Sequence, residues 1–379
     1  MGSAAAYFLA ISDCAANISV IEPDETYAKA TTPAGAGGVR RLMCRPENIR
    51  MSQFSLDFYA DFHETMATES NTADIQFRRQ GYLFLTDAKG EADLVRNFET
   101  QKNEQVPAQL LDVDALRARF PSVGTENVAL ACHSPEDGWI DPYAALMGFR
   151  RKAESLGVSY IKDRVVGLNT SRSSVTYAEL ENGRRIQGDI FINTAGPWVS
   201  EVAQMTGAKL PVVPMCRVQH YWRCEHDIEP LPLVKDDSGV FFRPEGQGFV
   251  GGRPSWEIKP GFIWDIDRGY FANYFEDTVW ELIANIIPKF ESVKLERSWA
   301  GHYAQNVLDG NMIIGRYSKG LDNILTACGF SGHGIMHAPA VGRALSELVL
   351  YDEFRTIDLT RLGFERVINN EPYSELGIK

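Results

Sequence analysis

The sequence predicts a mixed α/β fold in which a parallel-sheet domain is interleaved with a β-sheet domain, and three observations support this prediction. Near each end of the chain, at 17–41 and 323–350, a predicted strand is followed by a glycine-rich stretch, and a predicted helix lies close by. A β-rich block at 212–253 separates these two regions. The chain has 379 residues, of which 44% are hydrophobic, and this content suffices for the cores of about two domains.

The individual elements follow from local patterns in chain order. Residues 3–16, small and apolar, predict a helix, and 17–22 predict a strand that ends in Glu22. A long helix is expected at 47–70, where Ile49, Phe54, Phe58 and Phe62 share one face. Strands are expected at 81–86, 158–161, 165–168, 175–180, 186, 189–193 and 323–328, and helices at 91–104, 112–118, 273–290 and 335–350.

Charge and composition exclude several classes of protein. The formal net charge of −12 argues against a nucleic-acid partner, because phosphate binding needs a basic surface. The apolar runs are shorter than the roughly 18 residues of a membrane span, and the N-terminus lacks the basic start of a secretory signal. The six scattered cysteines form no C-x-x-C pair, so we expect no metal site and a reducing, cytoplasmic location.

The start of the chain carries part of a dinucleotide-binding pattern. In a Rossmann-like fold, G-x-G-x-x-G joins a strand to a helix, and an acid ends the next strand about 20 residues on. Gly2 fits the third glycine, and Glu22 stands 20 residues after it. The first strand and two glycines would precede residue 1, so we expect a gap or an imperfect substitute in the sheet. Alternatively, Gly2 only follows an initiator methionine and Glu22 is a solvated turn acid.

Two further glycine motifs can bring the backbone close to a ligand. In 193–198, a buried strand breaks at Gly196 and Pro197 opens the next helix. In 329–336, three glycines at a helix start make a nest of amides that receives an anion. The first motif also fits a plain strand-to-helix turn.

The sequence resembles the FAD-dependent D-amino-acid oxidase and sarcosine oxidase superfamily over essentially its whole length. The resemblance rests on GSAAAYFL…VIEPD, TTPAGAGGVRR, PENIRMSQFSLDFY, DIFINTAGPW, GVFFRPEGQGFVGGRP and, most specifically, ACGFSGHGIMHAPAVGRALSELVL. Within this group it is most similar to sarcosine-dehydrogenase-like members, including mitochondrial ones linked to respiratory-complex assembly. It implies an FAD-binding domain at 1–75, 140–212 and 295–379 and a substrate domain at 76–139 and 213–294.

The resemblance also implies which residues contact a non-covalent FAD. Glu22 would hold the adenosine ribose, Val166 would offer its backbone to the adenine, and His333 would bond the flavin or a neighbouring carbonyl. Amides at the start of the last helix would stabilise negative charge on the reduced ring. The full set is Gly2, Ser3, Glu22, Thr32, Gly38, Arg40, Val166, Ala195, Gly196, Trp198, Gly301, Gly329, Gly332, His333, Gly334, Ile335 and Met336.

Three positions depart from monomeric sarcosine oxidases. Gly301 stands where those enzymes attach flavin through a cysteine, so covalent attachment there is not expected. Met336 replaces the lysine that binds the substrate carboxylate, and Val250 replaces the lysine that promotes reaction with oxygen. The departures favour a dehydrogenase over an oxidase.

Candidate catalytic residues are Arg41, Arg253, His302 and Tyr303. A substrate carboxylate needs a cation, which Arg41, Arg243 or Arg253 could supply, with Arg253 preferred, although each also fits a structural arginine. His302 fits a catalytic or a core histidine, and Tyr303 fits an aromatic wall. Tyr221, Trp222, Phe241 and Phe242 could wall the substrate cavity or belong to the sheet core.

The predicted function is FAD-dependent oxidation of the C–N bond of a small secondary amine or amino acid, sarcosine-like, by hydride transfer to flavin. Its partners would be that substrate and an electron acceptor, with no membrane span. In a eukaryote the mitochondrial matrix also fits. One alternative is a catalytically impaired flavoprotein fold with an assembly or scaffold role. The other, a nicotinamide dehydrogenase, leaves the 329–336 motif without a role.

Overall fold

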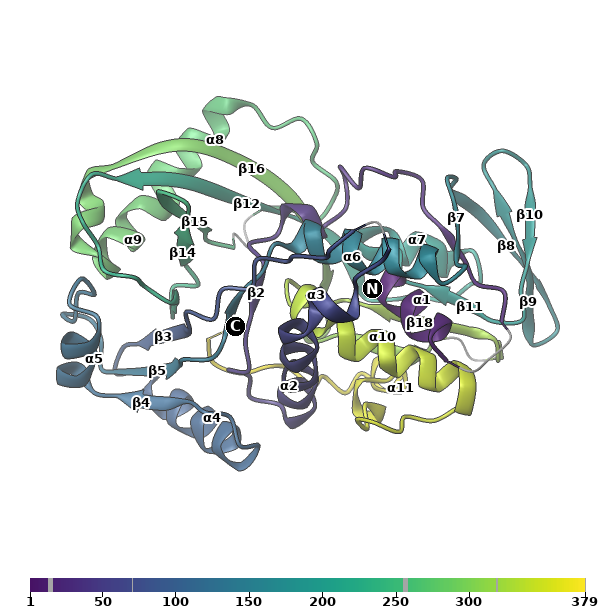
Figure 1. Cartoon of the computed structure of the whole chain (residues 1–379), viewed down its shortest axis with the longest axis horizontal. Coiled ribbons are helices and arrows are strands. Elements are labelled where there is room, and N and C mark those ends of the chain that lie inside the picture. The colour runs from purple at the N-terminus through teal and green to yellow at the C-terminus, as the bar shows by residue number, and fades with distance from the viewer. Residues whose placement is uncertain (13–15, 70, 255–257, 318–319, 379) are drawn as a thin grey trace.

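The computed structural model describes residues 1–12, 16–69, 71–254, 258–317 and 320–378. An eight-stranded sheet with a helical segment over it lies toward one end of the molecule, and short parallel strands with a separate hairpin lie toward the other (Figure 1). Long helices stand between these two ends. The predicted mixed α/β class is confirmed.

The parallel strands form two separate pieces. Strand β1 (Ser19–Ile21) pairs with β7 (Ser159–Ile161), and β11 (Phe191–Asn193) pairs with β18 (Ile324–Cys328). Strand β17 (Ile313–Arg316) completes the second piece in antiparallel direction. Among the described residues, β1 and β11 have no other strand neighbours, so the sheet shows the expected break.

Helix α1 (Gly2–Ala10) lies against α10 (Gly334–Tyr351) and α6 (Pro142–Ser155), and α2 (Pro46–Ala60) lies against α10. Gly342 permits the first of these contacts, because a Cβ there would come within 2.8 Å of the Ala4 carbonyl carbon. Aromatic rings fill the space between the helices, and Phe58 stacks on Phe149 at 5.6 Å between centroids. These contacts fix the start of α1 and the start of α10 in one place.

Three expected helices differ from the observed ones. Helix α1 ends at Ala10 instead of 16, where the Ser12 hydroxyl donates to the Leu9 carbonyl; residues 13–15 lie outside the described part. The helix expected at 47–70 breaks at Asp61 into α2 and α3 (Phe62–Thr65), and residue 70 is not described. The helix expected at 273–290 runs instead from 268 to 286 with a π-helical middle, and it ends there because Ile287 is extended before Pro288.

That segment comprises α8 (Arg268–Tyr274), the π-helical η3 (Phe275–Trp280), α9 (Glu281–Ile286) and η4 (Pro288–Ser292). It covers one face of the eight-stranded sheet, where Trp222, Phe242 and Phe290 are fully buried. The strand order is β16 (Val293–Asn306), β12 (Val212–Cys224), β15 (Gly248–Gly252), β14 (Phe241–Glu245), β13 (Leu233–Asp236), β3 (Tyr82–Thr86), β5 (Leu130–Ser134) and β4 (Gln109–Leu111).

Smaller elements complete the fold. The expected hairpin contains β8 (Val165–Ser171), β9 (Ser174–Leu180) and β10 (Arg185–Gln187). The others are η1 (Thr32–Ala34), β2 (Gly38–Val39), α4 (Glu91–Asn103), α5 (Val113–Arg119), β6 (Gly138–Trp139), η2 (Gly196–Trp198), α7 (Val199–Gln204), η5 (Thr360–Leu362) and α11 (Glu365–Ile368). No helix in the described ranges has the length and apolarity that a membrane crossing requires.

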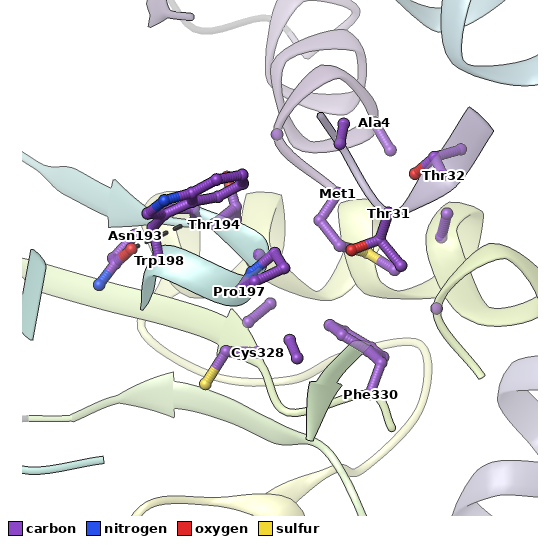
Figure 2. A pocket seen from close by; sticks show the side chains of 18 of the residues that line it. Met1, Ala4, Thr31, Thr32, Asn193, Thr194, Pro197, Trp198, Cys328 and Phe330 are labelled. Atoms are coloured by element: carbon purple, nitrogen blue, oxygen red, sulfur yellow. Dashed lines mark hydrogen bonds between the residues drawn. The ribbon is translucent and has the colours of Figure 1, made fainter. Parts of the chain in front are cut away.

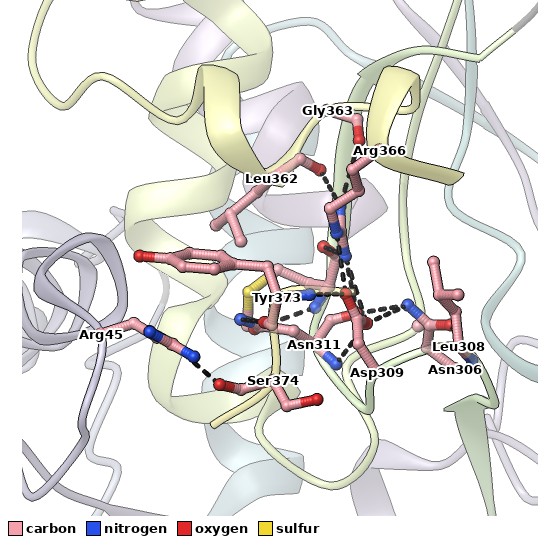
Figure 3. Close-up of polar contacts among 12 residues, drawn as sticks. Arg45, Asn306, Leu308, Asp309, Asn311, Leu362, Gly363, Arg366, Tyr373 and Ser374 are labelled. Atoms are coloured by element: carbon pink, nitrogen blue, oxygen red, sulfur yellow. Dashed lines mark hydrogen bonds and ion pairs between the residues drawn. The ribbon is translucent and has the colours of Figure 1, made fainter. Parts of the chain in front are cut away.

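A buried ion pair fixes the turn between β16 and β17 (Figure 3). The Asp309 carboxylate accepts from Arg366 Nε at 2.9 Å and from the Tyr373 amide at 2.9 Å. Arg366 also donates to the Met312 carbonyl at 2.7 Å. Both charged side chains are almost fully buried, so the C-terminal segment is tied to the strand ends that support the turn after β18.

We expect Asp309→Ala to lower the free energy of unfolding by about 3–5 kcal/mol, because the buried Arg366 guanidinium would lose its carboxylate. Urea unfolding followed by circular dichroism measures this change. Asp114→Ala, which breaks the exposed pair with Arg117, is the matched control and should change stability little. Equal effects of the two substitutions would contradict the structural role of the buried pair.

Candidate active site

One cavity of about 2000 Å³ runs from the parallel strands to the eight-stranded sheet. Glu22, Gly196 and Gly332, which come from distant parts of the sequence, all line it. Its wall contains residues of α1, β1, η1, β12 and β13, and of the turns after β11 and β18. Figure 2 shows part of this wall, to which Met1 and Ala4 at the start of the chain, Thr194, Pro197 and Trp198 after β11, and Cys328 and Phe330 at the end of β18 contribute.

One end of the cavity lies beside β1. Glu22 follows that strand directly, and its Oε1 accepts from the Asp24 amide at 2.9 Å. Burial raises the pKa of the Glu22 carboxyl, and the bond from the Asp24 amide acts in the opposite direction. Val166, on β8, lines the same end. This carboxylate is therefore placed at a cavity wall and held by its own turn.

The turn after β11 brings the backbone close to α1. Asn193 holds the turn, since its side-chain amide donates to the Val199 carbonyl at 3.0 Å. Gly196 has φ of 55°, a left-handed conformation. A Cβ on Gly2 would lie 2.9 Å from the Thr194 hydroxyl oxygen, so this approach favours glycine at residue 2.

The turn after β18 is left-handed at three positions, Gly329, Ser331 and Gly332. A Cβ on Gly332, with φ of 101°, would lie 2.7 Å from the Tyr303 ring. The Ser331 hydroxyl accepts from the Asn306 amide at 3.0 Å and holds the turn against β16. Helix α10 starts two residues later, and the first amides of a helix have no partner within it. Their place at the cavity wall makes this a site for negative charge.

Arg40 and His333 meet at the same place. Arg40 is 3% exposed, and its Nη2 lies 3.3 Å from His333 Nε2. Because a guanidinium only donates, Nε2 accepts, and the neutral ring carries its proton on Nδ1. His333 therefore contacts an arginine, a partner that neither sequence-based alternative included.

The candidate catalytic residues separate into two groups. Tyr303 lines the cavity, whereas Arg41, Arg253 and His302 are not among the described residues of its wall. Arg41 Nε donates to Asp137 at 2.8 Å, and Arg253 Nε donates to the Ser238 carbonyl at 3.0 Å. His302 Nε2 accepts from the Ile263 amide at 2.9 Å.

Other sequence candidates are placed as follows. Arg243 forms an ion pair with Glu245 and donates to the Ala36 carbonyl at 2.7 Å. Gly301 faces η1, where a Cβ would lie 2.5 Å from the Ala34 side chain, and it does not line the cavity; nor does Gly329. Phe241 lines the cavity, whereas Trp222 and Phe242 are in the core on the opposite sheet face. The remaining predicted cofactor residues all belong to the cavity wall: Gly2, Ser3, Glu22, Thr32, Gly38, Arg40, Val166, Ala195, Gly196, Trp198, Gly332, His333, Gly334, Ile335 and Met336.

Sequence reasoning missed four cations in the described wall, namely Arg217 on β12, Lys235 on β13, and Lys29 and Arg164 outside the strands. Arg217 is 5% exposed, and its guanidinium carbon lies 5.4 Å from the Tyr303 ring centroid, a cation–π contact. Burial lowers the pKa of the Arg217 guanidinium, and the phenol of Tyr303 opposes this shift. Neither strand marks its cation in the sequence, because β12 also contains Gln219 and His220 and β13 also contains Asp236.

The profile of FAD-dependent oxidoreductases matches residues 1–348. The chain belongs to this family. It is 34% identical to "FAD-dependent oxidoreductase domain-containing protein 1" of Xenopus laevis, with 100% of this chain and 83% of the relative covered. It is 25% identical to human mitochondrial dimethylglycine dehydrogenase over 64% of this chain and 30% of that protein. L-proline dehydrogenase from P. horikoshii shares the fold with a TM-score of 0.82 and 25% identity, covering 98% and 96% of the chains.

This membership confirms the predicted family and FAD as its cofactor. The cavity of this FAD-dependent oxidoreductase fits such a group in three respects. Gly332 and Gly196 keep the wall free of side chains where the backbone approaches, and the first turn of α10 presents amides to the cavity. The acidic group at the other end, Glu22, suits ribose hydroxyls.

Proposed function

We propose that this protein is a dehydrogenase that oxidises the C–N bond of a small secondary amine or amino acid. The observation that carries the proposal is the continuous cavity, which joins the glycine-lined region at β1, β11 and α10 to a buried cationic and aromatic end at Arg217 and Tyr303. When bound, FAD supplies the acceptor for a hydride.

The residues that would hold FAD lie in the parallel-strand half of the cavity. Glu22 would accept from ribose hydroxyls, and the Val166 backbone would meet the adenine. Amides from Gly332 to Met336 would stabilise negative charge at the flavin end. Because Gly301 offers no thiol, we propose non-covalent binding. The two-domain division expected from the sequence, with its discontinuous ranges, is part of this proposal.

Arg217 would bind the carboxylate of an amino-acid substrate. Its buried guanidinium lies in the cavity wall, where a charge-assisted bond to a carboxylate is stronger than in water. The Tyr303 ring fixes one side of that guanidinium and leaves a flat wall beside the substrate. A neutral amine already has the lone pair that drives hydride loss, so the chain has to orient the substrate and exclude water.

Two observations favour a dehydrogenase, and a third favours a reducing compartment. Val250 and Met336 stand where monomeric sarcosine oxidases carry lysines. Val250 is also buried, at 3% exposure. The five described cysteines are free thiols, in keeping with the cytoplasm or, in a eukaryote, the mitochondrial matrix.

Anaerobic bleaching tests the proposed activity. The full chain with FAD should show a flavin absorbance near 450 nm that falls on addition of sarcosine or another N-methyl amino acid, as expected for a flavin that accepts a hydride. An artificial acceptor should then restore the absorbance faster than oxygen. Bound flavin that no amine reduces would contradict the proposal.

That contrary result would favour the second candidate, a flavoprotein fold with an assembly or scaffold role. The break between β1 and β11 is the observation behind it, because unpaired strand edges flank the region where the pyrophosphate would lie.

A further inference from the structure

The register of the eight-stranded sheet places Lys235 and Arg217 on one face. Residues that oppose each other in neighbouring strands point to the same side, and Lys235 opposes Phe241. Val250 opposes both Arg243 on β14 and Tyr221 on β12. Because side chains alternate along a strand, Phe241 shares the face of Arg243, and Arg217 shares that of Tyr221. Lys235, Phe241 and Arg217 all line the cavity, as this register requires.

The two cations lie on opposite sides of a small apolar surface of the sheet that contains Phe241. Strands β15 and β14 separate β12 from β13, so the backbones are about 14 Å apart at the usual strand spacing. Phe241 provides a ring between them, and the Lys235 ammonium lies 5.9 Å from that ring's centroid. Both side chains are long and flexible. A small molecule lying over Phe241 can therefore meet one cation at each end.

The surroundings of Lys235 favour the binding of an anion. In the part of the chain that the structure describes, Lys235 takes part in no ion pair. Asp236 is adjacent in sequence, but strand alternation puts it on the other face, where it accepts from the Ser238 amide at 3.0 Å. Burial and, to a smaller degree, the Arg40 guanidinium together lower the pKa of Lys235 to about 7. A second cation in this cavity repels the first, and a negative ligand would relieve both effects.

We propose that Arg217 and Lys235 form a two-cation site that selects an amino acid with a second carboxylate, carried on its side chain or on its N-substituent. This inference rests on the proposed function and deepens it, since it names the substrate class. Arg217 would hold the carboxylate next to the reacting carbon. Lys235 would hold the second carboxylate across the Phe241 ring.

The site has a pH signature. Because a bound carboxylate raises the pKa of Lys235 above its value of about 7 in the free protein, binding above pH 7 takes up a proton. The extra affinity for a dianion is present below pH 7 and is lost as the pH rises. Arg40 and Asp236 act on the pKa of Lys235, and Arg243 and Tyr82 share its face of the sheet. Because these groups lie close by, a substitution of Lys235 is needed to assign the pH dependence of binding to this residue.

Two probes that carry no amine test the site apart from any oxidation. Thiodiacetate has two carboxylates, and (methylthio)acetate has one. In calorimetry on the full chain with FAD, thiodiacetate should bind about tenfold tighter or more, the size of one charge-assisted hydrogen bond. Lys235→Met should abolish this preference and the proton uptake, and Lys235→Arg should keep the preference without the pH effect. Lys89→Met, at an exposed lysine after β3, is the matched control.

The outcomes separate this inference from the proposed function. Equal binding of the two probes, or an unchanged preference in a folded Lys235→Met protein, would overturn the two-cation site. If sarcosine bleaches the flavin in that case, the proposed activity stands. If thiodiacetate is preferred through Lys235 and no amine reduces the flavin, the site stands as an anion site and the proposed activity fails.

Discussion

Arg217→Met is expected to lower kcat/KM for an amino-acid substrate by about 100- to 1000-fold, which corresponds to about 3–4 kcal/mol of lost transition-state binding. The guanidinium lies buried in the cavity wall beside Tyr303, and a methionine there would leave the substrate carboxylate desolvated without a cation. Anaerobic stopped-flow measurement of flavin reduction gives this ratio directly. Arg217→Lys should recover part of the loss, because it keeps the charge and loses the planar donor pair.

Arg253→Met is the informative comparison for this prediction. Sequence reasoning preferred Arg253, whereas the structure places its Nε on the Ser238 carbonyl and outside the described cavity wall. We therefore expect Arg253→Met to change kcat/KM much less than Arg217→Met. A larger loss at Arg253 would assign the carboxylate to that residue and remove Arg217 from the site.

The second large effect concerns the break in the parallel sheet. Joining an apolar strand and a G-x-G-x-x segment, about 10 to 20 residues in all, before Met1 should raise FAD affinity about 100-fold or more, because backbone amides would then bind the charged pyrophosphate. The unpaired edges of β1 and β11 are available to such a strand, and the cavity extends between them. Quenching of flavin fluorescence measures the affinity.

A matched extension tests whether strand pairing causes the gain. Two consecutive prolines in the added strand would remove one amide toward β1 and one toward β11, because successive residues of a strand pair with opposite neighbours, while the length stays the same. This version should bind FAD no better than the present chain. Equal affinity for the two extensions would show that the break between β1 and β11 does not limit cofactor binding.

Local signals predicted those parts of the fold in which neighbouring residues decide the structure. The strand, glycine turn and helix at 323–350 were confirmed, since left-handed turn positions and a helix start are encoded within a few residues. The break of the helix at Asp61 was not predictable, because aspartate is compatible with a helix and no glycine or proline marks the position. Helix α6 was missed, although Asp141 caps it by accepting from the Ala144 amide at 2.9 Å.

The site shows the same division. Glycine motifs near 2, 196 and 332 pointed to the cavity, because their chemistry is local. Arg217 and Lys235 line the same cavity only because the pairing of four strands places their side chains on one face of the sheet. Arg40 contacts a histidine that lies 293 residues away in sequence. Periodicity within one segment carries no information about such pairs, so the cationic end of the cavity could be recognised only in three dimensions.

The most direct test of this account is the electron density of crystals grown with FAD. We expect one extended FAD molecule in the cavity, with its ribose at Glu22, its pyrophosphate beside Gly196 and its ring at Gly332 and the start of α10. Flavin density at another location, or a closed wall between Glu22 and Gly332, would contradict it.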